Sequence, residues 1–499
     1  MEEELQAIHD HGVFGDGEFV DLPEGRRALP SHWVYKVKRD SAGTIQRFKA
    51  RLVCGGNHQQ EGIDYKETYA PTARLSHVRL ALAIAAKYGL ELQQMDFCTA
   101  FLGVPLEEEI YMVPPQGYGA TGGVKRKVLR LRKSLYGLKQ SPHVWYGTFK
   151  DFLVSIGFVP SRVDGGLFIL RNASGEVDCV LVLFVDDLLL LGALDIIENL
   201  KKRLMERFRM HDLGAASHYL GMVIERDTTT GTIAIHQHAY IQSILEKFGM
   251  GEAKPVATPI AMKLHKRRES EEACDKELYQ SMIGSLMYAM LATRPDLAHA
   301  VGVVSRYSHD PSKEHMAAVK RIFRYIAGTR NWKLILGGAT VDDDTGLVVY
   351  TDSDYAGDPD DYRSTSGLCV AFGGAMVDWR SRKQKSTAQS TTDAEYYAFG
   401  VGCMRTIQLV QILHELGVSQ RPILNTDSQS MLASIKGNIY RGTQITHIAT
   451  KFHLAAEMVR NGEIELRYVA TVDMVADAMT KALPRPVFLP LCRRMGLCG

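Results

Sequence analysis

The chain has 499 residues, which is enough for roughly two to four domains with substantial hydrophobic cores. Its content of 45% hydrophobic and 23% charged residues is ordinary for a globular protein. The formal net charge of +2 excludes a uniformly basic surface, so any contact with nucleic acid must use a local basic patch.

Neither the cysteines nor the N-terminus indicates export. The cysteines are scattered and form no CxxC pair, which favours reduced thiols. The first residues, MEEELQAIHD, are acidic and lack the apolar stretch of a signal peptide. We therefore expect an intracellular protein without a membrane partner.

Residues 1–30 form a Gly-, Pro- and charge-rich segment that is expected to pack loosely. The first candidate site comes after this segment. Beyond it, a strand would place Arg47, Lys49 and Arg51 on one face, because these cations alternate with apolar residues. This face predicts a clamp for a triphosphate or a phosphate backbone. A strand face exposed to solvent explains the pattern equally well.

An acid follows at the end of a predicted strand. The segment LELQQMDFCTAFL carries Asp96 toward an apolar turn, with Phe101 shortly after it. Taken alone, Asp96 is better explained as a helix cap or a turn residue.

Residues 125–139 form a basic segment without a single acid. Tyr136 lies within this segment and Trp145 follows it. Cations that neutralise phosphates beside rings that stack on bases predict a nucleic-acid track, and a solvated basic face is the weaker alternative. The cations are Lys125, Arg126, Lys127, Arg130, Arg132, Lys133 and Lys139.

The most informative segment is CVLVLFVDDLLLLG, an apolar run interrupted by Asp186 and Asp187. It predicts two buried strands joined by a tight turn that presents both acids. Carboxylates about 4 Å apart repel by roughly 4 kcal/mol at an effective dielectric near 20, and a divalent metal ion would relieve this repulsion. A plain hairpin with an Asp-Asp turn is the alternative, whereas the run is too short to span a membrane.

Together with Asp96, this pair could hold two divalent ions. Two such ions lower the pKa of an attacking hydroxyl and stabilise the leaving oxygen of an in-line phosphoryl displacement. The N-terminal acids therefore favour polymerase chemistry.

A second set of acids, in the C-terminal half, accompanies a predicted mixed α/β sheet. Asp352 and Asp427 end strands, Glu395 lies in the first turn of a long helix, and Asp477 lies on a short helix. Acids at strand ends and helix starts cluster at one edge of such a sheet. Each acid has an alternative as a helix cap, but four caps in this order are less plausible.

The order of motifs resembles the reverse transcriptase of copia-type LTR retrotransposons, from about residue 30 to about residue 484. The motifs are WVYKVKRD, RFKARLV, GIDYKETYAP, QMDFCTAFL, LEEEIYM, LYGLKQSPHVWY, LFVDDLLL, YLGMVIE and TRPDLAHAVGVVSRY. The resemblance implies a right-hand polymerase fold of fingers, palm and thumb, then a helical connection.

The resemblance also implies roles for individual residues. Asp96, Asp186 and Asp187 match the metal-binding triad of the family, and Phe101 matches the residue that excludes ribonucleotides. Lys49 and Arg51 fall in the segment that contacts the incoming triphosphate, Tyr136 and Gly137 flank the nucleotide pocket, and Tyr219–Glu225 matches the primer-gripping hairpin.

The C-terminal half resembles a copia-type ribonuclease H domain through TDSDYAGD, STTDAEY and VADAMTKAL. Asp352, Glu395, Asp427 and Asp477 match its two-metal hydrolytic site. The chain departs from the family pattern at Phe184, where Tyr is usual, at Gly103-Val104, and at Thr446 and Ala449, where Lys and Asp are common.

These features predict an α/β (α+β) fold class with a polymerase fold and a C-terminal ribonuclease H-like mixed α/β domain. The expected divisions are a loose N-terminal segment 1–30, fingers and palm 31–215, primer grip and thumb 216–270, connection 271–345, ribonuclease H-like domain 346–485 and a C-terminal tail 486–499.

The resemblance predicts an RNA- and DNA-directed DNA polymerase that also degrades the RNA of RNA/DNA hybrids. It implies two Mg²⁺ ions per active site, with Mn²⁺ as a substitute. The implied partners are an RNA template, a DNA primer, an RNA/DNA hybrid and deoxynucleoside triphosphates. The implied setting is the cytoplasm or a virus-like particle, with nuclear access and homo-oligomerisation left open. The alternative is an inactive retroelement relic or a recruited nucleic-acid-binding protein.

Overall fold

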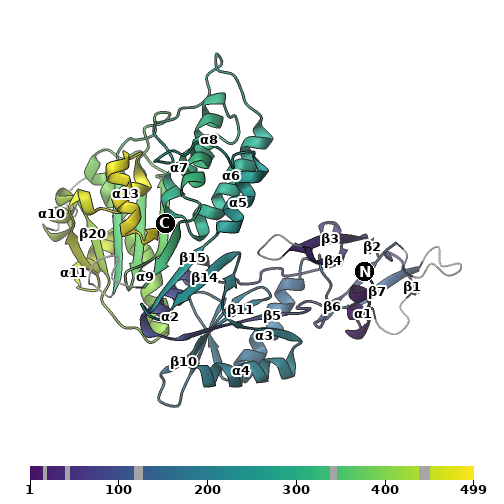
Figure 1. Cartoon of the computed structure of the whole chain (residues 1–499). Coiled ribbons are helices and arrows are strands. Elements are labelled where there is room, and N and C mark those ends of the chain that lie inside the picture. Colours follow the sequence, from purple (N-terminus) through teal and green to yellow (C-terminus); the bar gives the residue numbers. More distant parts are fainter. Residues whose placement is uncertain (15–18, 40–44, 117, 119–126, 338–345, 438–449) are drawn as a thin grey trace. The chain divides into compact units, whose positions relative to one another are not determined.

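The structure is a computed structural model that describes residues 1–14, 19–39, 45–116, 118, 127–337, 346–437 and 450–499 (Figure 1). It divides into two compact units, which are described separately below. The first contains residues 1–73 and 93–214, and the second contains residues 74–92 and 215–499. No helix in the described part of the chain combines the length and the apolarity that a bilayer-spanning segment needs.

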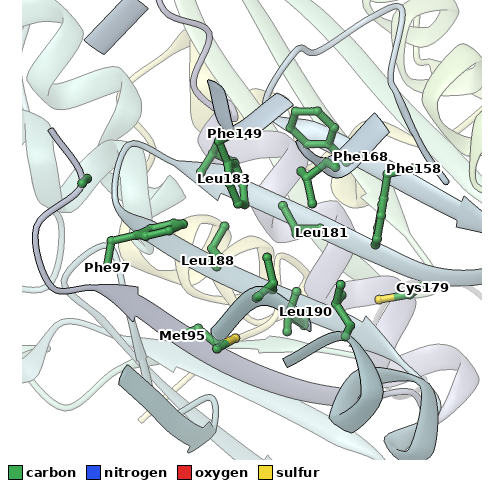
Figure 2. Packing of buried hydrophobic residues seen from close by; sticks show 14 of the residues in the cluster. Met95, Phe97, Phe149, Phe158, Phe168, Cys179, Leu181, Leu183, Leu188 and Leu190 are labelled. Carbon is green, nitrogen blue, oxygen red and sulfur yellow. The ribbon is translucent and has the colours of Figure 1, made fainter. Parts of the chain in front are cut away.

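The first unit is built around a six-stranded sheet in the order β12-β5-β11-β10-β9-β8. Its strands are β5 (Glu91–Phe97), β8 (Phe158–Pro160), β9 (Leu167–Arg171), β10 (Val177–Phe184), β11 (Asp187–Gly192) and β12 (Met210–Ala215). Helices α3 (Ser141–Ser155) and α4 (Leu194–Arg207) contribute Phe149 and Leu200 to its core. Figure 2 shows this core, in which Leu181, Leu183, Leu188 and Leu190 meet aromatic side chains.

Strands β10 and β11 form an antiparallel hairpin in which Phe184 lies opposite Asp187. Both strands read as continuous apolar runs because side chains on both of their faces are buried. The expectation of two buried strands joined by a tight turn is therefore confirmed.

A smaller sheet in the order β1-β7-β6-β2 and the hairpin β3-β4 complete the first unit. Their bounds are β1 (Phe19–Asp21), β2 (Ala28–Leu29), β3 (Ser31–Arg39), β4 (Ile45–Cys54), β6 (Pro105–Met112) and β7 (Lys127–Lys133). A short 3-10 turn, Gly56–His58, follows β4.

The N-terminal segment differs from the expectation of loose packing. Helix α1 (Glu2–Asp10) opens the chain, and Ile8, Val13 and Phe14 belong to the core that β4, β6 and β7 share. These three apolar side chains are almost completely buried, because they cover the end of that core. The Gly-, Pro- and charge-rich composition of this segment did not indicate that these few apolar residues would be buried.

The second unit contains two five-stranded sheets. One has the order β13-β14-β15-β16-β22, with β13 (His218–Tyr219), β14 (Met222–Asp227), β15 (Thr232–His236), β16 (Lys333–Leu336) and β22 (Leu497–Cys498). The helices of this part are α5 (His238–Lys247), α6 (Lys276–Ala292), α7 (Ala298–Ser305), α8 (Lys313–Gly328) and α13 (Arg485–Arg494), with a 3-10 turn at Pro295–Leu297. The expected C-terminal tail thus forms a helix and an edge strand.

The other sheet has the order β19-β18-β17-β20-β21. Its strands are β17 (Leu347–Asp354), β18 (Thr365–Phe372), β19 (Ala375–Lys383), β20 (Ile423–Thr426) and β21 (Glu465–Tyr468). The first three are antiparallel, and β20 and β21 add in parallel. With helices α9 (Thr391–Glu415), α10 (Gln429–Gly437), α11 (Thr450–Arg460) and α12 (Asp477–Thr480), this sheet confirms the predicted mixed α/β fold class.

Helix α2 (Leu75–Tyr88) packs within the second unit, although it lies inside the sequence range expected for fingers and palm. Buried Arg79 donates to the carbonyl of Val377 at 2.8 Å and lies 3.9 Å from the centre of the Trp379 ring. A guanidinium that satisfies backbone carbonyls and stacks on an indole can be buried without a large penalty. This long-range contact ties residues 74–92 to β19.

Candidate active sites

The first pair of acids lies where β10 turns into β11, with Asp186 in the turn and Asp187 at the start of β11. Val185 has a φ of 58°, a left-handed conformation that a β-branched residue rarely adopts. Trp145 stabilises the turn, because its Nε1 donates a hydrogen bond to the Val185 carbonyl at 3.0 Å. Trp145 is also buried, so its expected role in stacking on bases is wrong.

Asp96 lies on the neighbouring strand β5, one residue before its end. The amide of Phe97 donates to the carbonyl of Asp186 at 3.2 Å, which joins the end of β5 to the turn. Asp96 and Asp186 line one cavity of about 610 Å³. Asp187 is the first residue of β11, and the three acids do not each bring an oxygen to within 4.8 Å of the others.

The same cavity is lined by cations from β4. Lys49 and Arg51 both contribute to its wall, as does Tyr136. The guanidinium of Arg51 lies 4.6 Å from the centre of the Tyr136 ring, a cation–π distance. Phe101 makes a T-shaped contact with Tyr136, with 5.4 Å between ring centres, but Phe101 is not among the residues that line the cavity.

Gly137 fixes the backbone beside Tyr136. Its φ of 93° is unfavourable for other residues, and a Cβ there would overlap the carbonyl oxygen of Cys54. The amide of Cys54 donates to the Tyr136 carbonyl at 2.8 Å. The glycine therefore allows the loop to approach β4 closely enough to position Tyr136 in the cavity.

Helix α1 also lines this cavity, which no sequence motif predicted. Glu3 forms an ion pair with Arg47, and Glu4 contributes to the wall. Burial raises the pKa of Glu4, and the nearby cations Lys49 and Arg51 offset only part of this rise. Arg209 and His211, which follow α4, were missed as well. No local motif marks any of these residues.

The basic segment is partly described. Lys127, Arg130 and Arg132 are exposed along β7, and Arg130 pairs with Glu109 at 2.7 Å. Lys125 and Arg126 lie outside the described residues, as do Thr446 and Ala449. The expected primer-gripping hairpin, Tyr219–Glu225, corresponds to the paired strands β13 and β14, with Tyr219 buried.

The C-terminal acids converge more tightly. Asp352 lies on β17, Asp427 directly follows the adjacent parallel strand β20, and Asp477 begins α12. Each of these acids offers one oxygen, and the three oxygens lie within 4.8 Å of one another. The carboxyl ends of neighbouring parallel strands meet at one edge of a sheet, which is why residues far apart in sequence meet here.

Glu395, on α9, is the fourth acid of this cluster. Its Oε1 accepts hydrogen bonds from the Ser353 amide at 3.1 Å and the Ser353 hydroxyl at 2.8 Å. Its Oε2 is buried without a hydrogen-bond partner among the described residues. Burial and the charge of Asp352 raise the pKa of Glu395 to about 8.

Lys481, which was not among the predicted site residues, lies beside these acids. Lys481 Nζ is 2.8 Å from Asp477 Oδ1 and 3.8 Å from Asp352 Oδ2, and Thr480 Oγ1 also donates to Asp352. Burial and Asp352 raise the pKa of Asp477 to about 7, although Lys481 acts in the opposite direction. The spacing of one helical turn from Asp477 was the available signal for Lys481.

The chemistry of this cluster fits a divalent metal ion. Clustered carboxylates with raised pKa values and a buried oxygen without a partner are unfavourable unless protons or cations compensate them. Hard carboxylate oxygens are the ligands that Mg²⁺ and Mn²⁺ prefer. The residues that could hold such an ion are Asp352, Glu395, Asp427 and Asp477.

Comparison with known proteins was made on sequence and on structure. Residues 17–262 match the family model described as "Reverse transcriptase (RNA-dependent DNA polymerase)". The chain is 40% identical over 504 aligned residues to the "Retrovirus-related Pol polyprotein from transposon TNT 1-94" of Nicotiana tabacum, covering 99% of this chain and 37% of that protein. It is 34% identical to the corresponding polyprotein from transposon RE1 of Arabidopsis thaliana, covering 94% of this chain and 32% of that protein.

Two solved structures are similar at low sequence identity. The foamy viral protease-reverse transcriptase dRH in complex with ds DNA is 12% identical, covers 94% of this chain and 68% of that chain, and gives a TM-score of 0.48. LC11-RNase H1 in complex with RNA/DNA hybrid is 17% identical, covers 27% of this chain and 93% of that chain, and gives a TM-score of 0.22.

The two sequence relatives agree with each other and with the motif order, and the chain spans about a third of their length. The matched segment, residues 17–262, includes Asp96, Asp186 and Asp187. This chain therefore contains a reverse transcriptase domain and is similar along almost its whole length to copia-type retrotransposon Pol polyproteins.

Proposed function

We propose that this chain is an RNA- and DNA-directed DNA polymerase whose C-terminal domain hydrolyses the RNA of RNA/DNA hybrids. The observation that carries the polymerase assignment is one cavity that contains Asp96 and Asp186 together with Lys49 and Arg51. A deoxynucleoside triphosphate with its metal ions needs carboxylates for the ions and cations for the phosphates.

In this proposal the residues of the cavity bind and orient the incoming nucleotide. Lys49 and Arg51 hold the phosphates, and Tyr136, which Phe101 contacts, forms a wall for the sugar. Gly137 keeps the Tyr136 backbone against β4. Asp96, Asp186 and Asp187 would hold Mg²⁺, with Mn²⁺ as a substitute, and a bound ion would supply the positive charge that lowers the pKa of the attacking hydroxyl.

The hydrolytic assignment rests on the compact cluster of Asp352, Asp427 and Asp477. Glu395 completes the cluster, and its Ser353 contacts orient one oxygen so that the other remains available to a metal ion. Lys481 partly neutralises the acids and holds Asp477 in position. The proposed substrates are an RNA template, a DNA primer and their hybrid.

Paired substitutions test both assignments in one protein. With a primed RNA template, deoxynucleotides and Mg²⁺, the unaltered chain should extend the primer and cleave the hybrid. Asp186→Asn should abolish extension and spare cleavage, whereas Glu395→Gln should spare extension and abolish cleavage. Asp151→Asn, an exposed acid on α3, serves as the matched control and should change neither activity.

A recruited nucleic-acid-binding protein is the alternative. It predicts tight binding of the hybrid without either reaction in the unaltered chain. If the unaltered chain folds but catalyses neither reaction, the enzymatic proposal is rejected. If Asp186→Asn alone abolishes both reactions, the assignment of two separate sites is rejected.

A further inference from the structure

We propose a second kind of metal site, outside both carboxylate clusters, in which His265, Glu271 and Glu314 bind one Zn²⁺ ion. His265 and Glu271 belong to the segment between α5 and α6, and Glu314 lies in the first turn of α8. A bound ion would fasten this connecting segment to α8. The polymerase and nuclease assignments do not depend on this site.

The distances fit a shared ion better than hydrogen bonds. His265 Nε2 lies 3.7 Å from Glu271 Oε1 and 3.9 Å from Glu314 Oε2, and one ligand atom from each residue lies within 4.8 Å of the others. Both separations are too long for a hydrogen bond. Zinc bonds of about 2.0–2.2 Å in tetrahedral geometry imply about 3.3–3.6 Å between ligand atoms, which is a few tenths of an ångström shorter than the two distances from His265 Nε2.

The orientation of the His265 ring suits a metal ligand. Its Nδ1 is 2.9 Å from the carbonyl of Lys266, and a carbonyl only accepts, so Nδ1 carries the proton. In the neutral ring, the lone pair then lies on Nε2, which faces the two carboxylates. A backbone carbonyl that fixes the tautomer is the usual support of a metal-binding histidine.

The other two ligands are also held in place. Glu271 Oε2 accepts from the Arg268 amide at 3.2 Å, which leaves Oε1 directed toward His265. Glu314 lies within the capping box of α8, in which Ser312 accepts from the His315 amide, so the backbone of Glu314 is fixed. A preorganised set of ligands lowers the conformational entropy that ion binding must overcome.

Backbone contacts bring the two segments together before any ion binds. The ring of His315 contacts the carbonyl of His265 at 2.8 Å, and the Lys313 amide donates to the carbonyl of Glu272 at 3.0 Å. Arg267 pairs with Asp310 at 2.9 Å. One imidazole and two carboxylates form a ligand set that suits Zn²⁺, with the fourth position left for water.

The experiment uses the full chain after chelation, with excess Mg²⁺ to saturate the carboxylate clusters. Zn²⁺ is titrated by calorimetry, and Co²⁺ is titrated by visible absorption, which reports the coordination geometry. We expect one equivalent of Zn²⁺, a Co²⁺ spectrum of tetrahedral intensity, and a higher unfolding temperature with Zn²⁺ than with chelator.

Three variants decide the outcome. His265→Gln should lose Zn²⁺ binding at this site, and Glu314→Gln should weaken it at least about 10-fold, since each removes a ligand. His309→Gln, an exposed histidine a few residues away, should bind as the unaltered chain does. Both test positions are partly exposed, so the variants should fold.

Two results would overturn the proposal. In one, the unaltered chain binds no Zn²⁺ in excess Mg²⁺, which would mean that the cluster forms only long ion pairs. In the other, His265→Gln and Glu314→Gln bind Zn²⁺ as tightly as His309→Gln, which would place the ion elsewhere.

Discussion

The two carboxylate sites differ in how tightly their acids are gathered. Asp96 and Asp186 are spread along the wall of a cavity of about 610 Å³ that also contains cations. Asp352, Asp427 and Asp477 bring their oxygens to within 4.8 Å of one another, and the pKa values of Glu395 and Asp477 are raised. The first arrangement leaves room for a large anionic substrate, whereas the second concentrates negative charge at one point.

The difference indicates which charges would be needed to balance each site. In the N-terminal cavity, Arg51 and Lys49 line the same wall as the acids, so an anionic substrate would meet cations as well as carboxylates there. In the C-terminal cluster, Lys481 supplies only part of the compensation, and metal ions would supply the rest. Substitutions at either site should therefore have separable effects.

Removing a central acid should have the largest effect. Asp352→Asn removes the carboxylate that contacts both Thr480 and Lys481, so hybrid cleavage should fall by at least about 10²–10³-fold. Primer extension should change little. Cleavage and extension are measured on the same preparation, and Glu457→Gln, an exposed acid on α11, is the control. Equal loss of both activities would contradict the separation of the sites.

Adding a methyl group at Gly137 should disrupt the wall of the N-terminal cavity. Gly137→Ala places a Cβ against the Cys54 carbonyl at a φ of 93°, so the free energy of unfolding should fall by about 2–3 kcal/mol. The affinity for deoxynucleotides should fall as well, because Tyr136 moves. Gly147→Ala, on α3, meets no atom within 4 Å and should stabilise the chain by up to about 1 kcal/mol. Denaturant unfolding and the KM for deoxynucleotides check both.

The C-terminal cluster should make the metal-free chain more stable in mild acid. Because the pKa of Glu395 is about 8 in the folded chain against an ordinary 4.5, the folded state binds a proton that the unfolded state lacks within this window. The free energy of unfolding should therefore fall as pH rises through this window. The stabilisation that protonated Glu395 contributes is complete below its ordinary pKa of 4.5 and is lost above its folded-state pKa of about 8.

Glu395→Gln supplies the check on that pH dependence. The variant should flatten the profile between about pH 5 and pH 8 and be more stable than the unaltered chain at the upper end, when both are measured with chelator. An unchanged profile would show that another group titrates. Adding Mg²⁺ to the unaltered chain should displace protons and reduce the same slope.

The smallest effect is expected at Trp145. Trp145→Phe keeps a ring among Phe97, Phe149 and Phe208 but loses the hydrogen bond to the Val185 carbonyl, which should cost about 1 kcal/mol of stability. Extension should slow because the turn that carries Asp186 is less constrained, and hybrid cleavage should not change. A variant that slows both reactions equally would point to global destabilisation.

Much of this architecture could be predicted from the sequence because it depends on local patterns. The apolar run on both sides of Asp186 and Asp187 predicts two buried strands and their turn, because strands buried on both faces accommodate consecutive Leu and Val side chains. The order of strands and helices after Leu347 likewise encoded the mixed sheet, and the acids at their ends indicated where a site would form.

Tertiary structure alone decided which distant residues meet. Glu3 and Glu4 line the N-terminal cavity, Arg79 packs against Trp379, and the last strand, β22, pairs with β16. Each contact joins segments with no shared periodicity, so no local signal predicts it. Such contacts form because buried polar groups must find partners and apolar faces must be covered, and the available partner depends on the packing of the whole unit.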